Sequence, residues 1–159
     1  MAPKSKAQLP GEVFLSHSSK DRKVVAKIAE TLRAHGIPVW YGETNLRGAQ
    51  QWHDEIGKAL ARCDWFLIVL SPSSVRSQWV KRELHYALRD ERYEDRIMPV
   101  LHRACDSSKL SWTLAGFQTV DFTGDFAASC RSLLRAWGLG FQNLKPSARR
   151  NAEARARRK

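Results

Sequence analysis

The sequence predicts an α/β domain whose five-stranded parallel sheet is doubly wound, with strand order 2-1-3-4-5 and helices on both faces. Short apolar runs rich in branched and aromatic residues alternate with helical patterns five times along the chain. The run Trp65–Leu70 is apolar throughout, which is typical of a strand buried on both faces. A chain of 159 residues, 43% of them hydrophobic, is long enough for one such domain.

Each element is predicted from its own pattern. Pro38 in the second apolar run favours an edge strand, because proline cannot donate to a ladder. Ser18 and Asp21 have the spacing of a capping box at the start of the first helix, and Gly36 is suited to end that helix. A polar loop without periodicity is expected at Gly42–Gln51. The expected strands are Glu12–Ser16, Ile37–Tyr41, Trp65–Leu70, Arg96–Leu101 and Gln118–Phe122, and the helical patterns cover residues 24–32, 52–63, 80–88 and 126–137.

One carboxylate is predicted to lie at the edge of the core. Trp79 and Glu83 are four residues apart, so they share a helix face, and that face lies beside the apolar stripe. The strand order puts a switch point between the first and third strands, where ligands bind in open α/β sheets. We expect the crevice there to be lined by residues 17–20 and 71–74. The helix-face position and the strand order therefore both predict that Glu83 lies at this crevice.

Charge and composition limit the possible partners. The net charge is +11, and residues 145–159 hold seven basic residues against one acid. We therefore expect a polar leader at 1–10, a folded domain at 11–140 and a basic, disordered tail at 141–159. No aromatic residues interleave with the basic ones, so nucleic-acid binding is not favoured and a solubilising role is preferred.

The same chain shows no signal for a membrane span or a metal. No apolar run approaches the roughly 20 residues that a transmembrane helix needs. Three scattered cysteines predict a reducing compartment, which we take to be the cytoplasm. The histidines and cysteines have no metal-ligand spacing, so no metal site is expected.

Several doubly wound proteins are excluded by the strand ends. A response-regulator receiver needs acidic residues where this chain has Ser16-His17 and Leu70-Ser71. A flavodoxin needs a glycine in its phosphate loop, and residues 17–21 contain none. No GxGxxG or GxxxxGK[ST] sequence occurs, which excludes the usual dinucleotide and triphosphate loops.

Five segments, in this order and at this spacing, resemble the motifs of bacterial Toll/interleukin-1 receptor (TIR) domains. The resemblance covers residues 11–138. The chain departs from the pattern where Gly42 precedes the first acidic residue after the second strand, and where Arg47 replaces the usual proline of the following loop, called the BB loop. The segments are Val13–Asp21, Gly36–Tyr41, Leu46–Ile56, Leu70–Pro72 and Ser77–Leu84.

The resemblance implies a flavodoxin-like TIR fold and an NAD⁺ glycohydrolase, with Glu83 matching the catalytic glutamate. It implies NAD⁺ as substrate without a further cofactor, and a signalling nucleotide as product in bacterial anti-phage immunity. The substrate-binding residues it implies are Trp79, His17, Ser16, Ser71, Tyr41 and Arg47. Several also have an ordinary explanation, since Trp79 suits packing at the core edge, His17 polar filling of a loop, and Ser71 helix capping.

A second function stays open at this point. Many TIR domains are similar in acting as adaptors without catalysis, and in them a residue such as Glu83 would be a solvated helix residue paired with an arginine. In both classes the resemblance implies self-association through the BB loop (Gly42–Gln51) and adjacent helices. It also implies a separate effector protein as a partner.

Overall fold

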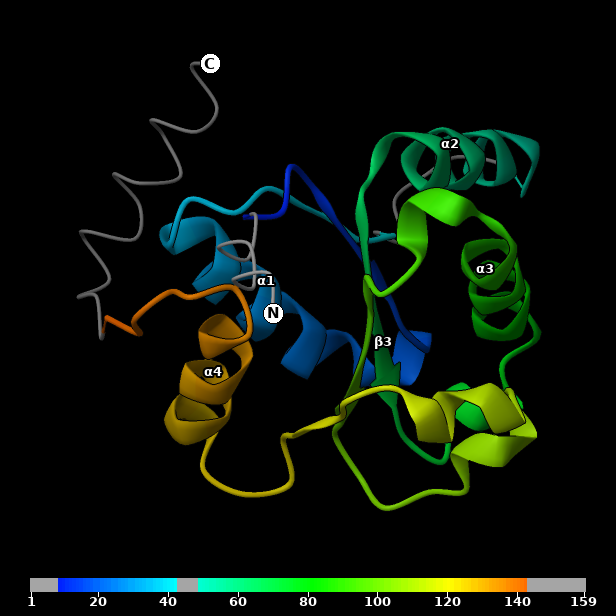
Figure 1. Ribbon diagram of the computed structural model, residues 1–159. Helices are drawn as coiled ribbons and strands as arrows, with labels where there is room; N and C mark the ends of the chain where they lie inside the picture. Colours follow the sequence, from blue (N-terminus) through cyan, green and yellow to red (C-terminus); the bar gives the residue numbers. More distant parts are fainter. Residues whose placement is uncertain (1–8, 43–48, 143–159) are drawn as a thin grey trace, which may run out of the picture.

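The computed structural model describes residues 9–42 and 49–142, and of residues 49–52 it describes only the backbone (Figure 1). Three predictions therefore lie wholly or mostly outside the described residues: the polar leader at 1–10, the basic tail at 141–159, and Arg47 with most of its loop.

The sheet has the predicted topology. Its five strands pair in the order β2-β1-β3-β4-β5, and every pair is parallel. The central strand β3 pairs with β1 on one side, where Leu15 faces Leu67, and with β4 on the other, where Leu67 faces Met98. This confirms the doubly wound, 2-1-3-4-5 prediction. The strands are β1 (Val13–Ser16), β2 (Val39–Trp40), β3 (Trp65–Leu70), β4 (Ile97–Leu101) and β5 (Val120–Asp121).

Two helices cover each face of the sheet. Figure 1 shows α1 and α4 on one side of β3, and α2 and α3 on the other. Short 3₁₀ helices occupy several of the connections, among them Ser19–Asp21 before α1 and Ser74–Arg76 before α3. The helices are α1 (Arg22–Ala34), α2 (Ala49–Arg62), α3 (Gln78–Arg89) and α4 (Phe126–Arg135).

Alternation along the strands builds a separate core on each face, because successive side chains of a strand point to opposite sides. Leu15, Leu67 and Val69 pack against α1 and α4. Phe14 and Phe66, stacked with ring centroids 5.5 Å apart, pack against α2 and α3. Since both faces are covered, β3 reads as a continuous apolar run in the sequence.

Several predicted boundaries were wrong. β2 keeps only two of the five expected residues, and β5 keeps only two, because each is an edge strand with a single ladder partner. α2 begins at Ala49, so the expected loop loses its last three residues to the helix. β1 and β4 each begin one residue later than expected, and two 3₁₀ helices, Ser107–Lys109 and Trp112–Gly116, lie between β4 and β5.

The predicted capping box was also wrong. Ser18 accepts from the backbone N–H of Lys20, not from that of Asp21, and Asp21 makes no side-chain cap bond to α1. The Asp21 carboxylate instead accepts from Ser71 on a different loop. Asp21, which was predicted to cap a helix, therefore makes a tertiary contact between two loops instead.

Two glycines follow helices in a left-handed conformation, and Gly36 was predicted to do so. Gly36 has φ +81° and Gly138 has φ +73°, conformations that side chains with a Cβ rarely adopt. Gly36 follows α1 and precedes β2, and Gly138 follows α4, the last helix of the described chain.

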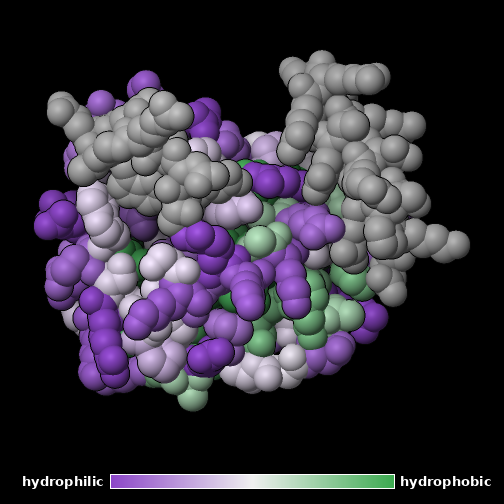
Figure 2. Space-filling model, turned by 180° about the vertical axis from the view of Figure 1, so that it is seen from behind, coloured by the Kyte–Doolittle hydropathy of each residue, from purple (hydrophilic) through white to green (hydrophobic). Residues whose placement is uncertain are grey.

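The surface is mostly hydrophilic. In the view from behind, small apolar areas lie between the charged side chains of the described residues (Figure 2). Within the described ranges, none of the helices combines the length and the apolar character required to cross a bilayer.

Candidate functional site

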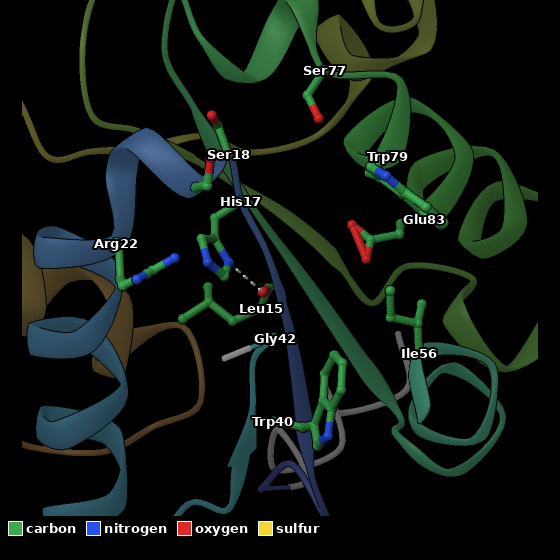
Figure 3. A pocket seen from close by; sticks show the side chains of 11 residues that line it. Leu15, His17, Ser18, Arg22, Trp40, Gly42, Ile56, Ser77, Trp79 and Glu83 are labelled. Carbon is green, nitrogen blue, oxygen red and sulfur yellow. Dashed lines mark hydrogen bonds between the residues drawn. The ribbon is translucent and has the colours of Figure 1, made fainter. Parts of the chain in front are cut away.

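A pocket opens at the carboxyl ends of β1 and β2, between α1 on one side and α2 and α3 on the other (Figure 3). The described residues enclose a hollow of about 160 Å³ there. Apolar side chains form its floor, and hydroxyl, imidazole, guanidinium and carboxylate groups stand along its walls. The lining residues are Leu15, His17, Ser18, Ser19, Arg22, Trp40, Gly42, Ile56, Ser77, Trp79 and Glu83.

Glu83 is the buried carboxylate of this pocket. Its residue is only 9% exposed, and Figure 3 shows its side chain reaching from α3 into the hollow. Burial raises the pKa of Glu83 to about 7, while the hydrogen bond that it accepts from Ser16 acts in the opposite direction. A carboxylate with a pKa near neutrality in a concave site is typical of functional sites.

The sequence positions Glu83 through the start of α3. Ser77 caps the helix, because its side chain accepts from the backbone N–H of Val80. Val80, Leu84 and Ala87 then bury the apolar stripe against the sheet. Glu83 lies beside that stripe, so it faces the C-terminal end of β1. There the Ser16 hydroxyl donates to Glu83 Oε1 over 2.9 Å.

Trp79 stands one turn before Glu83 at the mouth of the pocket. It lines the hollow and is 41% exposed, which is unusual for a residue of pure core packing. Its ring lies 6.0 Å from that of His53 on α2, and the Arg82 guanidinium lies 5.5 Å from its centroid. The indole therefore has contacts that hold it in place and still presents surface to solvent.

His17 lies in the opposite wall. Its Nδ1 is 3.2 Å from the Leu15 carbonyl oxygen, which can only accept, so Nδ1 carries the proton in this contact. Burial lowers the pKa of His17 below its ordinary value and outweighs the opposing effects of the Leu15 carbonyl and the Asp21 carboxylate. The ring is thus held neutral, with Nε2 available as an acceptor.

Ser16 and Tyr41, two of the predicted substrate-binding residues, stand behind the pocket wall. Ser16 is 1% exposed and reaches the pocket through Glu83. Tyr41 is half-buried, and its ring meets His17 edge-on at 6.0 Å while Arg33 lies over its face. Arg47 lies outside the described residues.

Ser71 is placed differently from its prediction. It is 1% exposed, and its hydroxyl donates to Asp21 over 2.5 Å and accepts from the backbone N–H of Ser74. The Ser74 hydroxyl in turn accepts from the backbone N–H of Ser71. We name Asp21, Ser71 and Ser74 the clasp. The clasp joins the loops after β1 and β3, so residues 71–74 do not form the predicted second wall and the hollow opens beside β2.

We expect Ser71→Ala to destabilise the fold by about 1–3 kcal/mol, because the buried Asp21 carboxylate would lose a donor and cannot recover it from water. Denaturant unfolding at pH 7 measures this change. Ser108→Ala is the matched control, since its hydroxyl also lies 2.5 Å from a carboxylate, that of Asp106, but in an exposed position. An equal loss in both variants would contradict a special role for burial in the clasp.

Six lining residues were missed by sequence reasoning as site residues: Leu15, Arg22, Trp40, Gly42, Ile56 and Ser77. Leu15, Trp40 and Ile56 carry a partial signal, since each belongs to the apolar pattern of its strand or helix. Ser77 carries the usual signal of a helix cap. Arg22 carries none, because a basic residue at an exposed helix start is ordinary.

Among the described residues, no group of three or more histidine, cysteine or acidic side chains is arranged to hold a metal ion. The pocket instead pairs one buried carboxylate with serine hydroxyls, a neutral imidazole and aromatic surface. Such a set can bind a polar ligand that carries a planar ring, and it can stabilise a positive charge beside Glu83.

The fold and this pocket define a doubly wound α/β domain with a buried carboxylate, Glu83, lining a pocket at the carboxyl edge of its sheet. A family model described as "TIR domain" matches residues 13–134. The chain belongs to the TIR domain family.

Two curated relatives carry the names of enzymes, one a cyclic ADP-D-ribose synthase and one an NAD(+) hydrolase. "2' cyclic ADP-D-ribose synthase BtTIR" of Bacteroides thetaiotaomicron is 31% identical over 94 residues, which is 58% of this chain and 33% of that protein. "NAD(+) hydrolase PdTIR" of Paracoccus denitrificans is 30% identical over 106 residues, 65% of this chain and 36% of that one. The matches thus span about a third of the length of these relatives.

Solved structures show the same fold. The TIR domain of the Toll-related receptor TRR-2 from Hydra magnipapillata gives a TM-score of 0.58 at 18% identity, covering 91% of this chain and 97% of that one. The TIR domains of the activated Roq1 resistosome give 0.62 at 18% identity, covering 78% and 97%. At this identity the likeness shows the fold alone.

Proposed function

We propose that this chain cleaves the bond between nicotinamide and ribose in NAD⁺, with Glu83 as the catalytic residue. The observation that carries the proposal is the position of Glu83: it is buried, it reaches into the pocket, and Ser16 holds its orientation. The printed names of the curated relatives, a cyclic ADP-D-ribose synthase and an NAD⁺ hydrolase, support the choice of substrate.

The reaction suits a single carboxylate. Ordinary glycosidases need one acid to protonate the leaving oxygen and a second carboxylate on the opposite side. The nicotinamide ring of NAD⁺ is already cationic and leaves as a neutral molecule, so no acid is needed. What remains is to stabilise the positive charge that develops on the ribose, and Glu83 in its anionic form supplies an opposite charge in a poorly solvated site.

The other residues have supporting roles in the proposal. Trp79 offers its exposed ring for contact with a planar part of the substrate. His17 offers Nε2 as an acceptor for a ribose hydroxyl. Ser16 positions Glu83, and Ser71 acts through the clasp. NAD⁺ is the substrate, and no further cofactor takes part.

The acceptor of the ribosyl group decides the product. Water gives ADP-ribose, whereas attack by a hydroxyl or adenine nitrogen of the same molecule gives a cyclic form. We propose that the product serves as a signalling nucleotide in bacterial defence against phage. We further propose that the reaction takes place in the cytoplasm, which agrees with three cysteines that form no disulfide.

The proposal is tested by incubating the purified chain with NAD⁺ and following nicotinamide release, with mass spectrometry of the remaining product. Release of nicotinamide supports the enzyme, and the product mass separates hydrolysis from cyclisation. Since TIR enzymes resemble one another in self-association, the assay includes high protein concentration and a crowding agent. Silence under all these conditions favours the second function, an adaptor that acts by binding other TIR domains through the BB loop.

Replacing Ser16 should change the pH profile of the reaction. The activity of the wild type should rise with pH through about 7, as Glu83 becomes anionic. Because the Ser16 hydrogen bond lowers the pKa of Glu83, Ser16→Ala should shift this rise to higher pH. The measurement is kcat/KM for NAD⁺ between pH 5.5 and 9. Ser132→Ala, on the exposed side of α4, should leave the profile unchanged, and an unshifted Ser16→Ala profile would contradict the positioning role.

A further inference from the structure

The pocket is electrically asymmetric. Figure 3 shows Arg22 and His17 on one wall, with Trp79 and Glu83 on the other. The carboxylate of Glu83 repels an anionic group placed near it and attracts a cationic one. The guanidinium of Arg22 does the opposite. A ligand that spans the pocket is therefore favoured if it carries a positive end toward α3 and a negative end toward α1.

Arg22 is available for such a ligand. Its side chain extends from the first residue of α1 toward His17 (Figure 3). In the described part of the chain, no carboxylate lies within ion-pair distance of its guanidinium. The neighbouring carboxylate of Asp21 accepts a hydrogen bond from Ser71 in the clasp. Arg22 can therefore form charge-assisted bonds to an anion without first breaking an ion pair.

Ser18 supplies a second, independent feature on the same wall. It lines the pocket and is only 8% exposed. Its oxygen accepts from the backbone N–H of Lys20, but its hydroxyl hydrogen has no acceptor among the described residues. A nearly buried hydroxyl with an unused donor is typical of a site completed by a ligand. Ser18 and Arg22 line the same pocket, so both can donate to an anionic ligand that binds there.

We infer that Arg22 and Ser18 form a subsite for the diphosphate of a dinucleotide. The inference rests on the proposed function, because Glu83 opposite would then meet the nicotinamide riboside end of the same molecule. The diphosphate is the part of NAD⁺ that carries negative charge. Its neighbouring ribose reaches His17, whose Nε2 accepts a hydrogen bond. The subsite thus fixes which end of NAD⁺ enters the pocket beside α3.

Binding of ADP-ribose tests the subsite without requiring turnover. Isothermal calorimetry with ADP-ribose would compare the wild type, Arg22→Ala and Lys23→Ala. Lys23 is the matched control, because it is the next residue on α1, is exposed, carries the same charge and does not line the pocket. Arg22→Ala should weaken binding by about 10- to 100-fold, the usual value of hydrogen bonds to a charged group, and Lys23→Ala by less than about 3-fold.

Three outcomes would overturn the inference: unchanged binding in Arg22→Ala, an equal loss in Lys23→Ala, or no detectable binding of ADP-ribose to the wild type at millimolar concentration. Thermal unfolding checks that both variants are folded. Absence of nicotinamide release from NAD⁺ would refute the proposed reaction, while the ADP-ribose comparison still decides the role of Arg22. Where turnover occurs, Arg22→Ala should raise KM for NAD⁺ much more than it lowers kcat.

Discussion

Glu83→Gln is expected to lower kcat for nicotinamide release by about 10³-fold. Glutamine has nearly the shape of glutamate, and its amide oxygen can still accept the hydrogen bond from Ser16. What it loses is the negative charge beside the ribose. Because the site is poorly solvated, no water replaces that charge when the bond breaks. The change should appear chiefly in kcat, since the carboxylate acts on a charge that exists fully only in the transition state.

Glu55→Gln is the control for this loss. Glu55 lies on α2, and its carboxylate is partly exposed and paired with Lys58. It should retain activity within about twofold, as expected for an exposed ion pair. If Glu83→Gln retains more than a tenth of wild-type kcat, the carboxylate is not the source of the catalysis, and another residue of the pocket must be sought.

The same substitution should make the fold more stable at alkaline pH. The pKa of Glu83 is about 7 in the folded protein, against an ordinary value of 4.5. Between these two values the folded state holds a proton that the unfolded chain releases, so stability falls as the pH rises through this window. Above about pH 7 the free energy of unfolding has lost the full contribution of this shift, roughly 3 kcal/mol. Glutamine carries no charge to bury, so Glu83→Gln avoids this cost.

Thermal unfolding at pH 5 and pH 8 measures this effect. At pH 8 the melting temperature of Glu83→Gln should exceed that of the wild type by roughly 5–10 °C, whereas at pH 5 the two should nearly coincide. Glu91→Gln, at an exposed position, should show no such difference between the two pH values. A variant that loses activity while gaining stability is the expected sign of a residue kept for function. Equal melting temperatures at pH 8 would mean that the carboxylate is better solvated than its burial indicates.

The fold could be predicted from the sequence because the apolar runs, the helical periodicity and the order of the elements all indicate the same architecture. The apolar run Trp65–Leu70 fixes the central strand to the residue, and the alternation of strands with helices leaves few topologies. Glu83 could be located because helical periodicity and the position of its helix are both local properties. The edge strands were less predictable, since their length depends on a ladder partner and not on their own composition.

The walls of the pocket could not be predicted in the same way. Ser18, Asp21 and Ser71 have local explanations as capping residues, and only the folded structure shows that Asp21 and Ser71 meet across 50 positions of sequence. That contact occupies the switch point between β1 and β3, and the pocket lies instead at the ends of β1 and β2. The role proposed for Arg22 could not be inferred from its own sequence neighbourhood, because it depends on the charge of Glu83 in the opposite wall.

The brevity of the two outer strands has a consequence for how copies of this domain can associate. β2 and β5 each contribute only two residues to the ladder. An incoming strand would therefore find almost no template of unpaired backbone groups on either margin, which protects the monomer from uncontrolled fibre-like growth. Any association between copies of this domain is therefore expected to depend on side-chain surfaces and not on strand pairing.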